Sequence, residues 1–157
     1  MANTMRWRYG DTNPVMIPVL TDTVIEIGDL VYLDTNNAKP ASALSDQGTL
    51  LLNQTEFRGK FAGVAMQASA DGETDSIRTA TTGVFEFDSD SATYELGDLI
   101  GAGENTAGDA LSDQKVDAAS AISGAIGRCA KRVDPASTRV LVDVVSTVMR
   151  GGAQAAS

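Results

Sequence analysis

The sequence predicts a mainly β fold, namely a compact β-barrel-like domain built from two pseudo-repeats, with one or two short helices and an extended N-terminal arm. Short stretches rich in β-branched and aromatic residues recur along the chain, and turn-forming residues separate them. Helix patterns are few, and 15 of the 157 residues are glycine. Many short strands at regular spacing are typical of closed β structures.

An internal repeat organises the middle of the chain. Three phrases recur in the same order, and the distance between the copies falls from 69 to 67 to 64 residues. The pairs are Ile27-Gly28-Asp29-Leu30 with Leu96-Gly97-Asp98-Leu99, Ala43-Leu44-Ser45-Asp46-Gln47 with Ala110-Leu111-Ser112-Asp113-Gln114, and Phe61–Ala65 with Ala125–Cys129. Two copies are too few for a solenoid, so the repeat predicts a closed pair of related halves.

The repeat suggests a division of the chain. Residues 1–20 form the predicted N-terminal arm, and residues 21–150 form a single β domain. Within it, pseudo-repeat 1 covers about residues 23–87 and pseudo-repeat 2 about 93–148. Residues 151–157 are small and polar, which predicts a flexible tail.

Local patterns predict the elements of the domain. Pro14 and Pro18 restrict residues 11–20 to an edge strand or an extended arm, because proline lacks the donor that a central strand needs. Strands are expected on both sides of the Gly28-Asp29 bend, and further along the chain at residues 61–66, 76–87, 93–100, 125–130 and 138–145.

Helix and turn signals are fewer. A short helix is expected over residues 54–60, capped by Thr55 and ended by Gly59, and a second over Val116–Ile122. Turns are predicted at Asp71-Gly72-Glu73 and at Asp134-Pro135.

Charge and hydropathy argue against two kinds of partner, nucleic acid and membrane. Twelve Lys and Arg against 21 Asp and Glu give a net charge of −9, which argues against nucleic acid, whose phosphates need clustered cations. The sequence contains no apolar stretch of membrane-spanning length, so no membrane contact is predicted. The single cysteine, Cys129, lies in an apolar run and is expected in the core.

The sequence offers little for catalysis, and we predict that the protein is not an enzyme and uses no cofactor or metal. It contains no histidine, which removes the commonest general base and metal ligand. Asp29 and Asp98 are the obvious carboxylate pair, which the repeat would place at related positions. They are expected to stabilise their Gly-Asp turns in similar surroundings, with Gly28 and Gly97 as the other structural turn residues. A carboxylate-only enzyme is the distant alternative, since an acid–base pair needs unlike environments.

Two loops allow other interpretations. The acidic residues at 71–75 and 88–90 could surround calcium, although neither stretch has the spacing of an EF-hand, and solvated turns explain them as well. The glycines at 101–108 lack the lysine of a phosphate loop, which favours a plain connection between strands.

Several segments, taken together, resemble the small capsid decoration, or cement, proteins of tailed bacteriophages. The resemblance covers about residues 20–148. The segments that carry it are Val24–Leu33, Lys39-Pro40-Ala41, Phe61–Ala65, Thr82–Phe87 and Tyr94–Leu99. It implies a compact β protein, often a trimer, which binds the outer surface of the phage head in the virion and bridges subunits of the major capsid protein. Such a protein is made in the host cytoplasm. The longer N-terminal segment and the second helix candidate depart from the smallest members of this group.

The first residues are the predicted attachment segment. We expect residues 4–20 to extend from the body and add a strand to a capsid subunit, with aromatic side chains as anchors. The predicted capsid-binding residues are Arg6, Trp7, Arg8, Tyr9, Val15 and Ile17. The alternative is a particle-displayed carbohydrate-binding β module, which would need an exposed aromatic platform from only eight Phe, Trp and Tyr residues.

Overall fold

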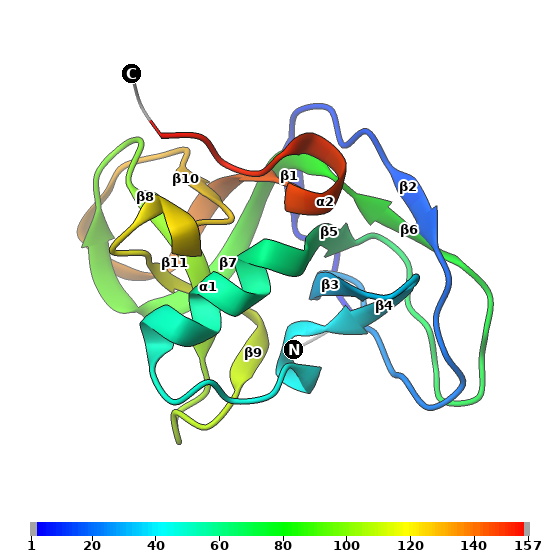
Figure 1. Cartoon of the computed structure of the whole chain (residues 1–157). Coiled ribbons are helices and arrows are strands. Elements are labelled where there is room, and N and C mark those ends of the chain that lie inside the picture. The colour runs from blue at the N-terminus through cyan, green and yellow to red at the C-terminus, as the bar shows by residue number, and fades with distance from the viewer. Residues whose placement is uncertain (1–2, 156–157) are drawn as a thin grey trace.

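A computed structural model describes residues 3–155, and it confirms the mainly β, barrel-like fold (Figure 1). The helical elements are η1 (Ala41–Ala43), α1 (Leu50–Lys60), η2 (Ile122–Gly124) and α2 (Thr147–Arg150). The strands are β1 (Trp7–Tyr9), β2 (Val15–Ile17), β3 (Leu30–Asp34), β4 (Asn37–Pro40), β5 (Phe61–Ala65), β6 (Ile77–Ala80), β7 (Thr82–Tyr94), β8 (Leu99–Glu104), β9 (Leu111–Ala118), β10 (Gly127–Cys129) and β11 (Val133–Val145).

The strands form two sheets that close on themselves. The first has the order β2-β6-β5-β3-β4, and the Ala38 amide of β4 closes it by donating to the carbonyl of Pro18, just after β2 (2.9 Å). The second has the order β1-β7-β11-β10-β8-β9, and a parallel pairing of Asp88 with Lys115 joins β7 to β9. The second barrel therefore contains five closed strands, and β1 is an extra strand on its edge.

The two barrels repeat one topology, with β2, β6, β5, β3 and β4 matching β7, β11, β10, β8 and β9. Gly63 of β5 and its counterpart Gly127 of β10 each lie against a backbone carbonyl, of Ala80 and of Asp143, where any Cβ would collide. The copies span β2 to β6 and β7 to β11, which corrects both predicted boundaries. Residues 82–87 belong to the second copy rather than to the first, and β2 belongs to the first copy rather than to an arm.

The core joins the barrels. A large apolar cluster includes Phe57 of α1, Phe61, Phe85 and Phe87, all fully buried, and it runs from the first barrel into the second. A smaller cluster around Ile17, Ile25 and Val31 fills the first barrel. Figure 1 shows the first barrel at the right, the second at the left and α1 crossing in front, so the helix covers the join.

The predicted arm is wrong for the described residues, because residues 3–20 pack against both barrels. β1 pairs with β7 (Trp7 opposite Phe85), and β2 pairs with β6 (Ile17 opposite Ile77). Arg6 is 5 % exposed and Ile17 is buried. Backbone pairing and burial therefore hold the segment that was expected to extend.

The C-terminal prediction also needs correction. Arg58 donates to the carbonyl of Ala153 (2.8 Å), and Arg128 donates to that of Gln154 (2.8 Å). Ala153 is buried. Residues 151–154 are thus held against the body, while the last two residues of the predicted tail lie outside the described part of the chain.

The helix predictions are partly right. α1 contains the expected residues but begins four residues earlier, because Thr49 rather than Thr55 caps it by accepting from the Leu52 amide (3.2 Å). Gly59 lies inside its last turn. The second predicted helix is wrong: Val116 lies in β9, and only a 3₁₀ turn, η2, follows at Ile122.

Two strand and turn expectations change as well. The expected strand over residues 23–27 is reduced to a single bridge between Ile25 and Ser69. The expected turn at Asp134-Pro135 lies within β11, where the register with β7 shifts between Val133 and Ser137. The turn at Asp71-Gly72 is present.

Candidate functional site

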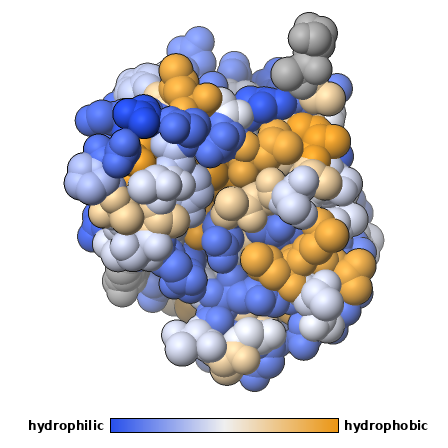
Figure 2. All heavy atoms as spheres, turned by 90° about the vertical axis from the view of Figure 1, so that its left-hand side faces the viewer, coloured by the Kyte–Doolittle hydropathy of each residue, from blue (hydrophilic) through white to orange (hydrophobic). Residues whose placement is uncertain are grey.

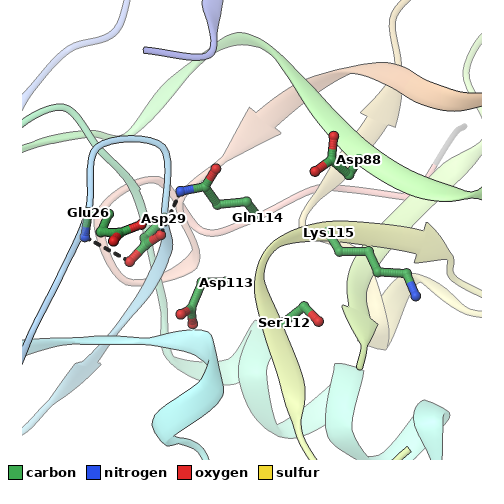
Figure 3. Close-up of a pocket in the computed structure, with 7 residues that line it drawn as sticks. All are labelled: Glu26, Asp29, Asp88, Ser112, Asp113, Gln114 and Lys115. Atoms are coloured by element: carbon green, nitrogen blue, oxygen red, sulfur yellow. Dashed lines mark hydrogen bonds between the residues drawn. The ribbon is translucent and has the colours of Figure 1, made fainter. Parts of the chain in front are cut away.

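A pocket of about 330 Å³ lies between the barrels, next to the first Gly-Asp turn (Figure 3). Four carboxylates, one hydroxyl, one amide and one ammonium group line it. These residues are Glu26, Asp29, Asp88, Ser112, Asp113, Gln114 and Lys115. The Lys115 ammonium turns away from Asp29 and pairs with Asp90 (2.9 Å), so carboxylates dominate the pocket wall.

Asp29 is the most perturbed group in this pocket. It is 3 % exposed, and burial raises the pKa of its carboxyl to about 6, although two hydrogen bonds oppose the rise. The Glu26 amide donates to one oxygen (2.9 Å), and the Gln114 side chain donates to the other (2.9 Å). One oxygen therefore stabilises the turn, and the other binds a side chain of the second barrel.

A buried polar chain ties the N-terminal segment to this turn. Arg6 donates through Nε to the Gln114 side-chain oxygen (2.7 Å), and Gln114 donates onward to Asp29. The Arg6 guanidinium also pairs with Asp88 at 3.4 Å. An amide thus bridges a buried cation and a buried carboxylate, an arrangement that is costly to break because each buried group loses a hydrogen-bond partner.

The two Gly-Asp turns have the same backbone hydrogen bonds. Gly28 donates to Ala65 and Gly97 to Cys129 (both 2.9 Å), and each aspartate accepts from the residue three before it. Both glycines have positive φ, +99° and +89°. The two aspartates differ in exposure, because Asp29 is buried whereas Asp98 is exposed and lines a different groove. The expectation of similar surroundings for the two aspartates is wrong, and the structure places them in separate pockets.

The predicted attachment residues divide between surface and interior. Trp7, Arg8 and Tyr9 are exposed along β1, while Arg6 and Ile17 are buried and Val15 is half-buried. Arg8 pairs with Glu86 (3.0 Å), which also binds Arg139 of β11 (3.3 Å). Only β1 therefore presents the predicted side chains to solvent together.

Helix α1 provides a second notable surface. It buries Asn53, Gln54 and Phe57 and leaves Leu51 and Leu52 exposed, which reverses the usual burial of polar and apolar side chains. Gln54 donates to carbonyls of Ala102 and Ala118, which explains its burial. Figure 2, which faces the left-hand side of Figure 1, shows apolar side chains gathered in patches on that side of the molecule.

Sequence reasoning missed Gln114 as a site residue. Its motif, Ala110–Gln114, was visible as a repeat, but the two copies of the motif make different contacts. Asp113 accepts from the Ser42 amide (2.8 Å) and Gln114 binds Asp29, both in the other barrel. In the first copy, Asp46 binds the neighbouring Gly48 amide (3.0 Å). The repeated motif therefore gave no signal of the contacts that Asp113 and Gln114 make with the other barrel.

The described residues contain no metal-binding group: within residues 3–155, no three Cys, Asp or Glu side chains are placed to hold an ion. No helix in that range is long and apolar enough to cross a membrane. Comparison of the sequence with protein-family models and with curated proteins gives no match.

Proposed function

We propose that this chain is a structural virion protein, a capsid decoration (cement) protein of a tailed bacteriophage. It binds the outer surface of the head and stabilises it by bridging subunits of the major capsid protein. The family resemblance of residues 20–148 motivates the proposal, and the surface of β1 supports it.

The observation that carries the proposal is the position of β1. Among the strands of residues 3–155, it alone lies outside both five-stranded barrels, and it forms the edge of the second sheet. Trp7 is 41 % exposed and Tyr9 51 %, with Arg8 between them. Exposed edge strands are usually blunted because they invite pairing, so an edge with two open aromatic side chains suits a binding surface.

Attachment then works by strand addition. The Arg6 carbonyl accepts from the Glu86 amide of β7 (2.9 Å), and neighbouring residues of an antiparallel strand turn their backbone groups to opposite sides. The backbone groups of Trp7 therefore point away from β7. A capsid strand pairs there, and the aromatic rings supply apolar contact area.

The same proposal includes a homo-oligomer, with a trimer favoured. Leu51 and Leu52 on α1 are exposed apolar side chains that a neighbouring protomer would cover. Several weak capsid contacts made by one oligomer act together, which raises attachment strength without any single tight contact.

The double substitution Trp7→Ser with Tyr9→Ser tests attachment. Both side chains are exposed, so the fold persists, and we expect co-sedimentation with empty heads lacking the protein to weaken by at least about tenfold. The matched control is Met16→Ser with Val24→Ser, which removes two apolar side chains of similar exposure (56 % and 52 %) outside β1.

Unchanged binding of the β1 variant would contradict the attachment model. A glycan array with the wild-type chain distinguishes the cement protein from the alternative, a particle-displayed carbohydrate-binding β module. Specific glycan binding that is lost in the β1 variant, combined with no binding to heads, identifies a carbohydrate-binding module that uses the same two aromatic residues.

A further inference from the structure

We propose that the second Gly-Asp turn, at Gly97-Asp98, is a binding site for an extended, cationic segment of a partner polypeptide. The first turn already holds such a segment, residues 3–6 of the chain itself. The inference rests on the repeat and does not depend on attachment through β1.

The first turn shows how a segment is bound. The Asn3 side-chain oxygen accepts from the Ile27 amide (3.1 Å), and the Thr4 amide donates to the Ile27 carbonyl (3.1 Å). The Thr4 carbonyl oxygen lies 2.8 Å from the place where a Cβ on Gly28 would be. Only glycine lets the segment lie this close to the turn.

The second turn has the same backbone hydrogen bonds, but no segment within residues 3–155 packs against its glycine. Leu96, the counterpart of Ile27, is 71 % exposed. A Cβ on Gly97 would meet nothing within 4 Å. An open groove of about 420 Å³ adjoins the turn, lined by Gly97, Asp98, Leu99, Ala118, Ala119 and Arg128. The glycine thus leaves room that no other part of residues 3–155 fills.

Charge identifies the kind of segment. At the first turn, a cation three residues after the Asn3 position, Arg6, reaches the aspartate through Gln114. At the second turn Asp98 is exposed, and no ion pair within residues 3–155 involves it. Arg128 lines the same groove, but its guanidinium donates to the carbonyls of Gly97 and Gln154 (both 2.8 Å) and forms no ion pair with Asp98.

The occupant is therefore an extended segment with three features. At its first position, a side-chain acceptor binds the Leu96 amide. At its second position, the backbone amide donates to the Leu96 carbonyl. At its fourth position, a Lys or Arg pairs with Asp98. The peptide Asn-Thr-Met-Arg-Trp, with capped ends, copies residues 3–7 and is a suitable probe.

The test is an amide NMR titration of the full-length protein with this peptide. We expect saturable shifts at Leu96, Gly97 and Asp98. Gly97→Asn places a Cβ in the path of the segment and should weaken binding by at least about tenfold. The matched control is Gly72→Asn, since Gly72 has a similar φ (+92°) and equally open surroundings.

Three results would overturn the inference: no saturable shift, equal binding by Gly97→Asn, or shifts confined to Ile27 and Gly28, which would mean that the peptide exchanges with the chain's own N-terminal segment. If Gly97→Asn fails to fold, Asp98→Asn tests the inference instead. The side-chain oxygen of the new asparagine still accepts the hydrogen bond of the turn, and only the negative charge is lost. A peptide with Gln in place of Arg should bind wild type as weakly as the original peptide binds Asp98→Asn.

Discussion

The two Gly-Asp turns have one backbone and opposite surroundings. Gly28-Asp29 is sealed by residues 3–6 and by Gln114 from the second barrel, whereas Gly97-Asp98 faces solvent. The difference changes the chemistry of the aspartate, because burial raises the pKa of Asp29. A duplicated motif therefore keeps its local structure while the rest of the chain decides whether it is core or surface.

The largest expected effect comes from removing the Gln114 side chain, which bridges Arg6 and Asp29 at the first turn. Gln114→Ala leaves the buried Arg6 and Asp29 without their bridge, which should lower the free energy of unfolding by about 3 kcal/mol. The counterpart in the first copy is Gln47, whose exposed side chain donates to the nearby Ser45 carbonyl (2.7 Å). Gln47→Ala should change stability by less than about 0.5 kcal/mol. Urea unfolding of both variants measures the contrast, and equal losses would contradict it.

A smaller effect is expected at the turn glycines. Gly28→Ala strains a residue with positive φ and pushes its Cβ against the Thr4 carbonyl, which should cost about 2 to 3 kcal/mol. Gly97→Ala carries the backbone strain alone and should cost about 1 kcal/mol. Thermal unfolding of the pair tests this difference. Matching losses would mean that residues 3–6 do not press on the first turn.

The smallest effect concerns pH. Because burial raises the pKa of Asp29 from 3.8 to about 6, its contribution to stability is complete below pH 3.8 and is lost as the pH rises through 6. The stability of wild type relative to Asp29→Asn should therefore rise by about 1 kcal/mol between about pH 7 and about pH 5. Urea unfolding at both pH values measures it. A constant difference, or one of opposite sign, would show that the buried carboxyl does not titrate in this range.

The two barrels also differ in their insertions and in the lengths of their strands. The first copy inserts α1 after η1, whereas the second has only η2 at the related place. The first copy opens with a three-residue strand, β2, and the second with the 13-residue β7, which leaves room for β1 to pair. Insertions and strand length, rather than the shared turn, distinguish the surfaces of the two halves.

The sequence by itself determined the features that depend on neighbouring residues. Positive φ at Gly28 and Gly97 and the short-range bonds of Asp29 and Asp98 span three residues, so the repeated motif fixes them wherever it lies. The duplication and the mainly β class were likewise readable from order and pattern. The extended arm and the helix at Val116–Ile122 were wrong, because local signals do not show that β7 pairs with β1 or that β9 pairs with β8.

Only the tertiary structure decided which turn is buried. Arg6 meets Gln114 across 108 residues, and Gln114 meets Asp29 across 85. No local pattern encodes such contacts, because they exist only after both barrels close and pack. The physical reason is the geometry of closure: it brings one copy of the motif beneath the N-terminal segment and leaves the other, with the same residues, on the surface.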